Sequence, residues 1–265
     1  MANWKFEETK DTPFGHTTDA AANKFVQLGY EPSDYYNFFP CFMNARTLAR
    51  YMSLYELYKA TLGLAGHIAE VGVFRGGVSL FFAKLMLLHE PHTVTQVHGF
   101  DWWREPSNPD DGEASDVGRG AAYDYTEPYE RITQLIGVQG LQRWAVMHRM
   151  NVLTDLQPFF AEHSHLQFKL VFLDAGDYDT VSRSIREFWP RLLPGGIMVF
   201  DQFNHEVAPG ESRAVRELLP EDAVIRALPS GWMPTAYVVK GEKVSPSNSG
   251  LCRLSLPCGE TLNVE

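Results

Sequence analysis

The pattern of apolar and polar positions changes at Ile68, where short apolar runs begin to alternate with segments of helical period. The apolar runs predict strands at 68–73, 96–101, 144–148, 168–174, 196–201, 223–228 and 235–240. Helices are predicted between them at 77–90, 127–137, 154–162, 178–190 and 210–219. Runs such as Lys169 to Leu173 are apolar almost throughout, which is typical of strands buried on both faces of a parallel sheet. The sequence therefore predicts an α/β fold with a mostly parallel seven-stranded sheet and helices on both faces.

The first 62 residues have a different pattern. They begin polar and turn-rich, become aromatic from Tyr30 to Pro40, and then show helical period from Asn44 to Thr61. The apolar stripe of this helix is interpreted as core packing and consists of Leu48, Tyr51, Met52, Tyr55 and Tyr58. We predict an N-terminal extension and helical cap over 1–62, a main domain over 63–243 and a C-terminal tail over 244–265.

A long segment at 103–120 interrupts the alternation and is too polar and glycine-rich to pack. Long loops in compact domains are usually lids or disordered insertions. Because it follows a polar strand end, a lid over a ligand is the preferred interpretation, and a disordered insertion is the alternative.

Composition narrows the possible partners. With 45% apolar residues among 265, the chain can bury a large core. Its 23 basic and 33 acidic residues give a formal net charge of −10, which disfavours nucleic acid and anionic membranes and favours a small-molecule partner. The N-terminus lacks the apolar core of a signal peptide, and the three cysteines form no C-x-x-C pair. We expect a soluble, cytoplasmic protein with reduced thiols.

The first predicted strand ends in an acidic residue and a glycine-rich turn. It reads Glu70-Val-Gly72-Val-Phe-Arg-Gly76-Gly77 and leads directly into a helix. Its glycine spacing does not fit the G-x-G-x-x-G turn that holds a dinucleotide pyrophosphate. An acidic residue before the glycine suits a cationic ligand, and S-adenosylmethionine carries an ammonium and a sulfonium group. The turn is interpreted as a cofactor site, and an ordinary glycine turn is the alternative.

Other strands also end in polar residues, and ligands of parallel sheets lie beyond such ends. Asp101 is predicted to bind the two hydroxyls of a ribose, since a carboxylate has two acceptor oxygens. Asn151 could pair with an adenine edge or cap the next helix. The 27-residue separation of Asp174 and Asp201 equals one strand-to-strand step, so both carboxylates should face one crevice. Together with Gln202 they form an oxygen site suited to Mg²⁺, and the alternative is that Asp201 and Gln202 cap a loop.

These segments resemble a known family. The stretch from Glu70 to Gly77, Phe100-Asp101, the stretch from Leu173 to Tyr178, and Leu193-Pro-Gly-Gly-Ile-Met-Val-Phe-Asp201 are similar to the class I S-adenosylmethionine-dependent methyltransferases, most closely the macrocin O-methyltransferase type. The resemblance covers residues 45 to 240. It implies a Rossmann-like class I methyltransferase fold and O-methylation of a sugar hydroxyl on a natural product such as an antibiotic.

Further roles follow from the resemblance residue by residue. It implies that the methionine end of the cofactor lies against Glu70, Gly72, Arg75, Gly76 and Gly77, with Ser79 near its carboxylate. It implies that Asp101 and Trp102 hold the ribose, with Asp174 on the same rim, and that Asp174, Asp201 and Gln202 bind Mg²⁺. Gln202 departs from the family's aspartate and brings no charge, which weakens the metal assignment.

The general base is the second departure from the family pattern. The family usually reads Asp-Gly-Asp after the fourth strand, whereas this chain reads Asp174-Ala-Gly-Asp177. Asp177 is one candidate for the base, and His205 is the other, since a histidine can accept a proton near neutral pH. The N-terminal aromatic residues suggest a homo-oligomer. A noncatalytic cofactor-binding protein and a different enzyme on the same sheet, such as an oxidoreductase or a hydroxylase-like relative, remain alternatives.

Overall fold

The computed structural model describes residues 25, 27–103, 129–206, 208–228 and 233–242. The predicted lid at 103–120 lies outside these residues except for Trp103. The predicted tail at 244–265 and most of the first 26 residues lie outside them as well. The limits of the three predicted segments therefore stay predictions.

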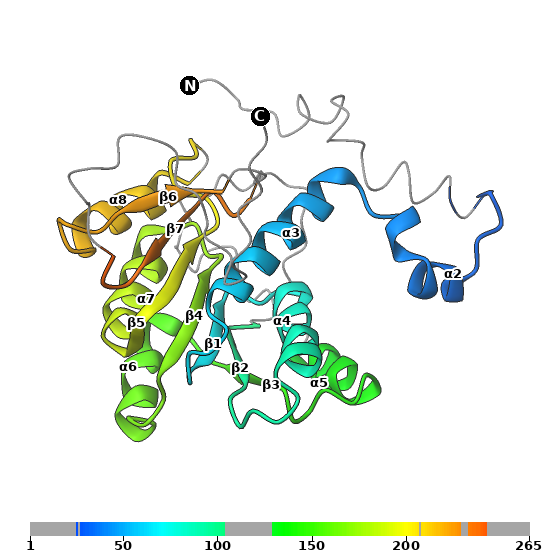
Figure 1. Ribbon diagram of the computed structural model, residues 1–265, viewed down its shortest axis with the longest axis horizontal. Helices are drawn as coiled ribbons and strands as arrows, with labels where there is room; N and C mark the ends of the chain where they lie inside the picture. The colour runs from blue at the N-terminus through cyan, green and yellow to red at the C-terminus, as the bar shows by residue number, and fades with distance from the viewer. Residues whose placement is uncertain (1–24, 26, 104–128, 207, 229–232, 243–265) are drawn as a thin grey trace, which may run out of the picture.

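A seven-stranded sheet forms the centre of the protein (Figure 1). Its strands are β1 (His67–Val71), β2 (Val97–Asp101), β3 (Ala145–Arg149), β4 (Phe168–Leu173), β5 (Leu192–Phe200), β6 (Ile225–Ala227) and β7 (Ala236–Val239). Their order across the sheet is β3-β2-β1-β4-β5-β7-β6. The first five strands are parallel, and β7 runs antiparallel to both β5 and β6. The predicted mostly parallel seven-stranded α/β sheet is confirmed.

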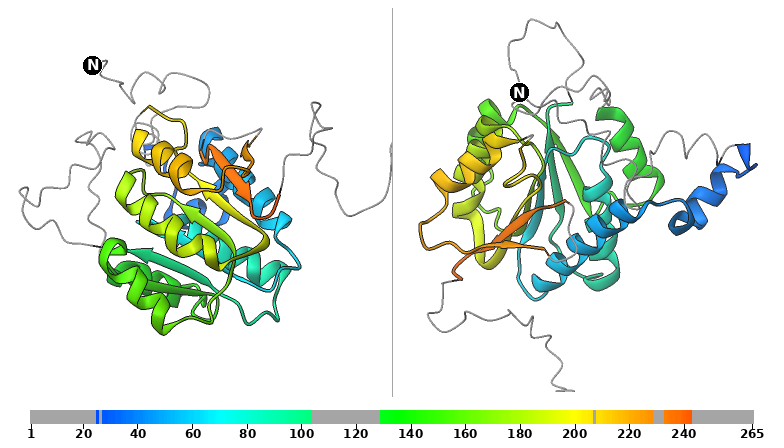
Figure 2. Two further views of the ribbon diagram at one scale, coloured as in Figure 1. Left: turned by 90° about the vertical axis from the view of Figure 1, so that its left-hand side faces the viewer. Right: turned by 90° about the horizontal axis from the view of Figure 1, so that it is seen from above.

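Helices cover both faces of the sheet, as Figures 1 and 2 show. One face carries α3 (Ala45–Ala60), α4 (Gly77–His89) and α5 (Tyr129–Val138), and the other carries α6 (Val152–Glu162), α7 (Tyr178–Arg191) and α8 (Pro209–Leu218). Side chains of a strand alternate between the two faces of the sheet. Leu170 and Phe172 of β4 therefore pack in the hydrophobic core under α3, α4 and α5, whereas Val171 and Leu173 pack in the core under α6, α7 and α8. All four are fully buried. This two-sided burial explains the almost continuous apolar run of β4.

The N-terminal helix α3 packs on the first face of the sheet. It begins after Asn44, whose side chain accepts a hydrogen bond from the Thr47 N–H at 2.7 Å. Tyr58 of the predicted apolar stripe is fully buried, but Leu48 and Met52 are 48% and 54% exposed, so the prediction that they belong to the core was wrong. The buried face is centred instead on Leu54, Leu57 and Tyr58, in the second half of α3.

The preceding short helices, α2 (Pro32–Asn37) and η1 (Phe39–Cys41), contain no buried residue. Figures 1 and 2 show α2 lying away from the sheet, beyond the start of α3. Within the described residues, α3 is therefore the part of the predicted N-terminal cap that covers the main domain.

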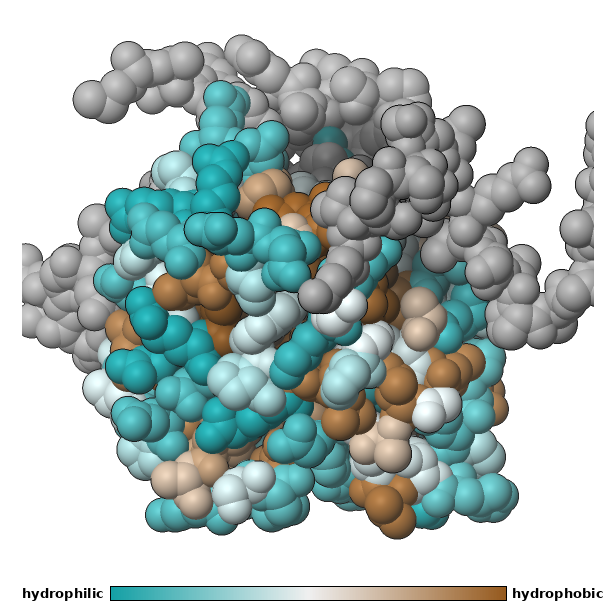
Figure 3. All heavy atoms as spheres, turned by 60° about the vertical axis from the view of Figure 1, so that its left-hand side comes forward, coloured by the Kyte–Doolittle hydropathy of each residue, from teal (hydrophilic) through white to brown (hydrophobic). Residues whose placement is uncertain are grey.

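The surface of the main domain carries both hydrophilic and hydrophobic residues. On the face shown in Figure 3, hydrophilic side chains are interspersed with smaller groups of hydrophobic ones. None of the helices in the described ranges has the length and apolar character that a membrane span requires.

Candidate active site

The acidic residues predicted to form a site lie at one edge of the sheet. The chain continues the parallel ladder beyond the strand ends: the Asp174 N–H donates to the Val71 carbonyl at 2.9 Å, and the Asp201 N–H donates to the Leu173 carbonyl at 3.1 Å. Asp101 ends β2, which pairs with β1. The structure thus brings Glu70, Asp101, Asp174 and Asp201 to neighbouring strand ends, as the sequence predicted.

The turn after β1 needs glycine for close packing. Gly72 has φ +89°, and a Cβ added there would lie 2.1 Å from the Asp174 carbonyl oxygen. Gly76, at φ +81°, precedes α4, and a Cβ there would lie 2.1 Å from the Ile132 Cδ1 atom. Gly77 and Arg75 are exposed beside them. The close approach at Gly72 brings the backbone of the β1 turn next to the end of β4, and that at Gly76 brings it next to α5.

Glu70 is a buried acidic residue near the end of β1. It is 2% exposed and accepts a hydrogen bond from the hydroxyl of Ser79, which is fully buried on α4. Burial raises the pKa of Glu70 to about 8, an increase that the Ser79 hydrogen bond opposes. Contacts of Glu70 and Ser79 with a cofactor stay predictions, because here the two residues bind each other.

Asp101 links two loops at the edge of the sheet. Its carboxylate accepts hydrogen bonds from the N–H groups of Phe74, at 2.8 Å, and Trp103, at 3.2 Å. The Trp103 indole N–H donates in turn to the Phe74 carbonyl at 3.0 Å. Each carboxylate oxygen can accept a further hydrogen bond, so binding of a ribose is compatible with these contacts and stays a prediction. Trp102, the second predicted ribose contact, is 40% exposed next to it.

Arg50 of α3 reaches the same edge and was not identified from the sequence. Its guanidinium donates to an oxygen of Asp201 at 2.5 Å and to an oxygen of Asp174 at 2.7 Å. The side chains of Arg50 and Asp201 are 18% and 3% exposed. Burial disfavours the Arg50 charge, but Asp201 and Asp174 outweigh it and raise the Arg50 pKa. Burial and the neighbouring Asp174 raise the pKa of Asp201, and Arg50 opposes this rise.

This arrangement does not fit the predicted Mg²⁺ site. Asp174 and Asp201 do face one another, but the Arg50 guanidinium lies where a cation bridging the two carboxylates would lie. Within the described part of the chain, no group of three or more His, Cys, Asp or Glu side chains is placed to hold a metal ion. The side-chain oxygen of Gln202 is buried without a hydrogen-bond partner.

A second residue that sequence reasoning missed, Glu211 of α8, supports the loop after β5. It is fully buried, and its carboxylate accepts a hydrogen bond from the Gln202 N–H at 2.8 Å. Burial raises the pKa of Glu211 well above its usual range, and the Asp201 charge adds to the rise. A buried carboxylate on a helix is not expected from the sequence, because Glu in helices is almost always exposed.

The remaining predicted residues have local structural roles. Asp177 precedes α7 and accepts a hydrogen bond from the Thr180 N–H at 2.8 Å, and Asn151 precedes α6 and accepts one from the Leu153 N–H at 3.0 Å. His205 is half-buried in the turn after β5. The capping alternative for Asn151 is therefore observed. An adenine contact by Asn151 and proton transfer by Asp177 or His205 stay predictions.

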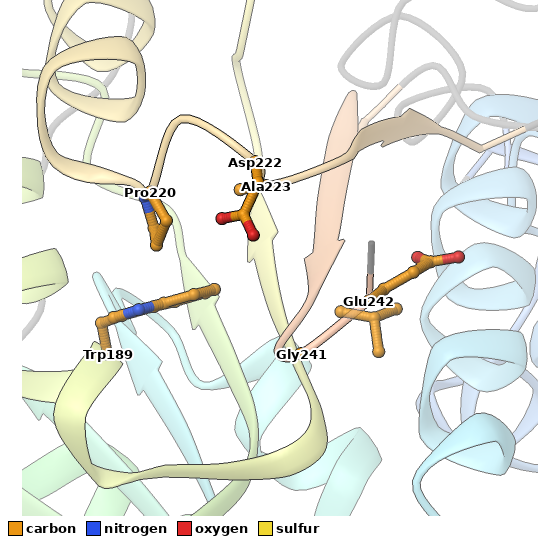
Figure 4. Close-up of a pocket in the computed structure, with 7 residues that line it drawn as sticks. Trp189, Pro220, Asp222, Ala223, Gly241 and Glu242 are labelled. Atoms are coloured by element: carbon orange, nitrogen blue, oxygen red, sulfur yellow. The ribbon is translucent and has the colours of Figure 1, made fainter. Parts of the chain in front are cut away.

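The small hollow drawn in Figure 4 lies elsewhere. Its volume is about 50 Å³, and it is lined by Trp189, Pro220, Asp222, Ala223, Val239, Gly241 and Glu242. Trp189 is near the end of α7 and Gly241 follows the antiparallel β7, so the hollow is at the opposite edge of the sheet from Asp174. Small-molecule sites are usually several times larger. The hollow does not belong to the candidate active site.

The fold and the acidic strand ends define a class of protein. The family described as "Methyltransferase domain" matches residues 69–203, from β1 to the turn after β5. This region makes up half of the chain and includes all four strand-end acids. The chain belongs to the methyltransferase-domain family. This membership favours a methyltransferase over the oxidoreductase and hydroxylase-like alternatives.

The chain is also similar to solved structures of methyltransferases. The crystal structure of CalS11, a calicheamicin methyltransferase, is 25% identical, with a TM-score of 0.71 over 86% of this chain and 96% of CalS11. An apo structure of CalS11, described as a TDP-rhamnose 3'-O-methyltransferase of calicheamicin biosynthesis, is 22% identical, with a TM-score of 0.69 over 85% of this chain and 93% of CalS11. The O-methyltransferase NovP shares the fold at 16% identity, with a TM-score of 0.56 over 72% of this chain and 79% of NovP.

No protein of curated function matches the chain in sequence. The family match and the CalS11 structures nevertheless confirm the predicted resemblance to class I S-adenosylmethionine-dependent methyltransferases of the antibiotic sugar O-methyltransferase type. The Rossmann-like class I fold is confirmed with it.

Proposed function

We propose that the protein transfers a methyl group from S-adenosylmethionine to a hydroxyl group of a small molecule, a sugar of a natural product. The observation that carries this proposal is the convergence of Glu70, Asp101, Asp174 and Asp201 on one sheet edge in a chain of the methyltransferase-domain family. The similarity to CalS11, a calicheamicin methyltransferase, supports a natural-product acceptor.

The residues at this edge suit the cofactor in charge and in shape. Carboxyl groups predominate there, and S-adenosylmethionine carries an ammonium and a sulfonium group. Gly72 lets the turn backbone approach Asp174 closely, and no other residue fits without displacing that carbonyl. We propose that the methionine end lies against Glu70, Gly72, Arg75, Gly76, Gly77 and Ser79, and that the adenosine lies against Asp101, Trp102, Asn151 and Asp174.

The chemistry requires two contributions from the protein. S-adenosylmethionine supplies an activated methyl group that moves to an oxygen by in-line displacement. The chain's own residues hold the acceptor oxygen in line and remove its proton. Asp177 and His205 are the proposed bases. Asp177 starts α7 next to Asp174, and His205 lies four residues beyond Asp201, so each is close in sequence to a strand-end carboxylate.

Calorimetry with S-adenosylmethionine and with NAD tests the cofactor assignment. We expect binding of the first and none of the second, and Asp101→Ala should weaken binding because Asp101 holds both loops. Failure of the wild-type protein to bind S-adenosylmethionine would refute the proposal.

Turnover of nucleotide-linked deoxysugars tests the reaction. Asp174→Ala and Asp201→Ala are expected to abolish turnover, and Asp201→Ala should leave cofactor affinity close to the wild-type value. Asp177→Asn and His205→Asn compare the two bases by kcat. Tight cofactor binding without turnover of any hydroxyl acceptor would favour the noncatalytic alternative.

Self-association is proposed for the N-terminal helices. Tyr36 of α2, Phe39 of η1 and Phe38 between them are between 54% and 77% exposed, so three exposed aromatic side chains lie close together in the chain. Light scattering of the purified chain should give a mass above that of the monomer, and Tyr36→Ser with Phe39→Ser should lower it.

A further inference from the structure

The contact between α3 and the strand ends is specific in its geometry. The two terminal nitrogens of Arg50 bind different carboxylates: one binds Asp201 at 2.5 Å and the other binds Asp174 at 2.7 Å. The guanidinium carbon also lies 5.2 Å from the centre of the Phe172 ring, a cation–π contact that adds to the two ion pairs. A planar fork of fixed nitrogens suits two neighbouring carboxylates better than a single ammonium does.

Arg50 is held in place by the packing of the rest of its helix. Leu54 and Leu57 are 0% and 3% exposed in the core. One turn further, the Tyr58 hydroxyl donates to Glu90 at 2.6 Å, and Glu90 also pairs with the fully buried Lys169 at 2.5 Å. The helix is thus tied both to α4 and to β4, so Arg50 reaches the site from a rigid support.

The carboxylates need a positive charge at this position. Asp174 and Asp201 are close enough for one guanidinium to bind both. Their charges also act on the nearby buried carboxyls, because Asp174 raises the pKa of Glu70 and Asp201 raises that of Glu211. Ionised groups so close together repel each other strongly where water is excluded. In many oxygen-rich sites a divalent ion supplies the compensating charge.

We infer that Arg50 is the resident cation of the active site: it takes the bridging position between Asp174 and Asp201, orients both carboxylates, and makes methyl transfer independent of divalent metal ions. Arg50 acts here as a positioning residue through the two aspartates. The effect of Arg50 on turnover rests on the proposed function. Its effect on metal binding can be tested whether or not that function is correct.

Metal binding provides the first test and requires no substrate. Mn²⁺ is titrated into the full-length wild-type chain and into Arg50→Met, and the free ion is followed by electron paramagnetic resonance. Met keeps an unbranched apolar side chain at this position but removes the charge, so Arg50→Met should bind Mn²⁺ at least about tenfold more tightly than the wild type. Equal affinity of the two proteins would overturn the inference.

A matched control is available in Arg226, which pairs with Glu242 at an edge of the sheet remote from the site. Its side chain is 27% exposed, comparable to Arg50. Arg226→Met should leave Mn²⁺ affinity and kcat at wild-type values. Thermal unfolding shows whether each variant is folded, and Arg50→Gln replaces Arg50→Met if the latter is not.

Turnover provides the second test. Wild-type kcat should be unchanged by EDTA, Arg50→Met should lose about 100-fold in kcat because the aspartates are misplaced, and Mn²⁺ or Mg²⁺ should restore part of this loss. Arg50→Lys should retain a higher kcat than Arg50→Met, and cofactor affinity should change little in either. Loss of wild-type turnover in EDTA with recovery in Mg²⁺ would overturn the inference. Absent cofactor binding would instead refute the proposed function and leave the Mn²⁺ result to decide the role of Arg50.

Discussion

Three histidines form a row across three neighbouring strands, and their hydrogen bonds make a sharp prediction about acid stability. The ring nitrogens of His67 and His98 are 3.0 Å apart, as are those of His98 and His148. The Gln96 backbone N–H donates to His67 Nδ1 at 3.1 Å, so this nitrogen is an acceptor and His98 Nε2 must donate to it. His98 Nδ1 then accepts from His148. His98 is therefore hydrogen-bonded at both ring nitrogens as a neutral ring.

A proton added to His98 would have no acceptor in this arrangement. His98 is 6% exposed and lies against Phe100 and Phe168. Burial, together with the charges of His67 and His148, lowers the His98 pKa to about 3, and burial lowers that of His148 to about 4. His163 and His165 also disfavour a charge on His98.

The sign of the pH dependence follows from these shifts. The unfolded chain protonates His98 below its ordinary pKa, whereas the folded chain keeps the ring neutral, so the unfolded state binds more protons between pH 6.5 and about 3. Stability should therefore be full above pH 6.5 and should fall as the pH is lowered through this window. From pH 7 to pH 5, His98 alone should cost about 2 kcal/mol of unfolding free energy.

Urea unfolding at pH 7 and pH 5 measures this effect. The difference between the two pH values should be about 2 kcal/mol smaller in His98→Leu than in the wild type, whatever the stability of the variant at pH 7. The exposed His92 provides the matched control, since His92→Leu removes a histidine that lies outside the row. If wild type and His98→Leu lose the same stability on acidification, the reasoning is refuted.

Three further predictions concern stability. Gly72→Ala should destabilise the fold by more than about 2 kcal/mol in thermal unfolding, because its Cβ would meet the Asp174 carbonyl at a positive φ; unchanged stability would contradict the close approach. Asp101→Ala should cost about 1–3 kcal/mol besides weakening cofactor binding, because it leaves two backbone N–H groups without their acceptor, and Asp101→Asn should recover part of this cost in the same melt. Lys169→Met should cost about 3–5 kcal/mol by leaving Glu90 without its cation, and adding Glu90→Gln should restore stability; a double variant as unstable as the single one would contradict this account.

The sequence by itself determined the layout of the main domain. Alternation of apolar runs and helical segments is a local property of the chain, so the strands were predicted within a few residues of their observed bounds, for example 68–73 for β1 at His67–Val71. The ends of parallel strands necessarily share an edge. The meeting of Glu70, Asp101, Asp174 and Asp201 followed from that rule and from chain order alone.

Only the tertiary structure decided which residues meet across elements. Arg50 is 124 residues from Asp174 and 151 from Asp201, and the periodicity of α3 shows that one face is buried but not what lies opposite it. The histidine row depends on the register between strands, since His98 is 31 residues from His67 and 50 from His148. Helix docking and strand register are set by side-chain packing between distant segments, which a pattern along one chain does not contain.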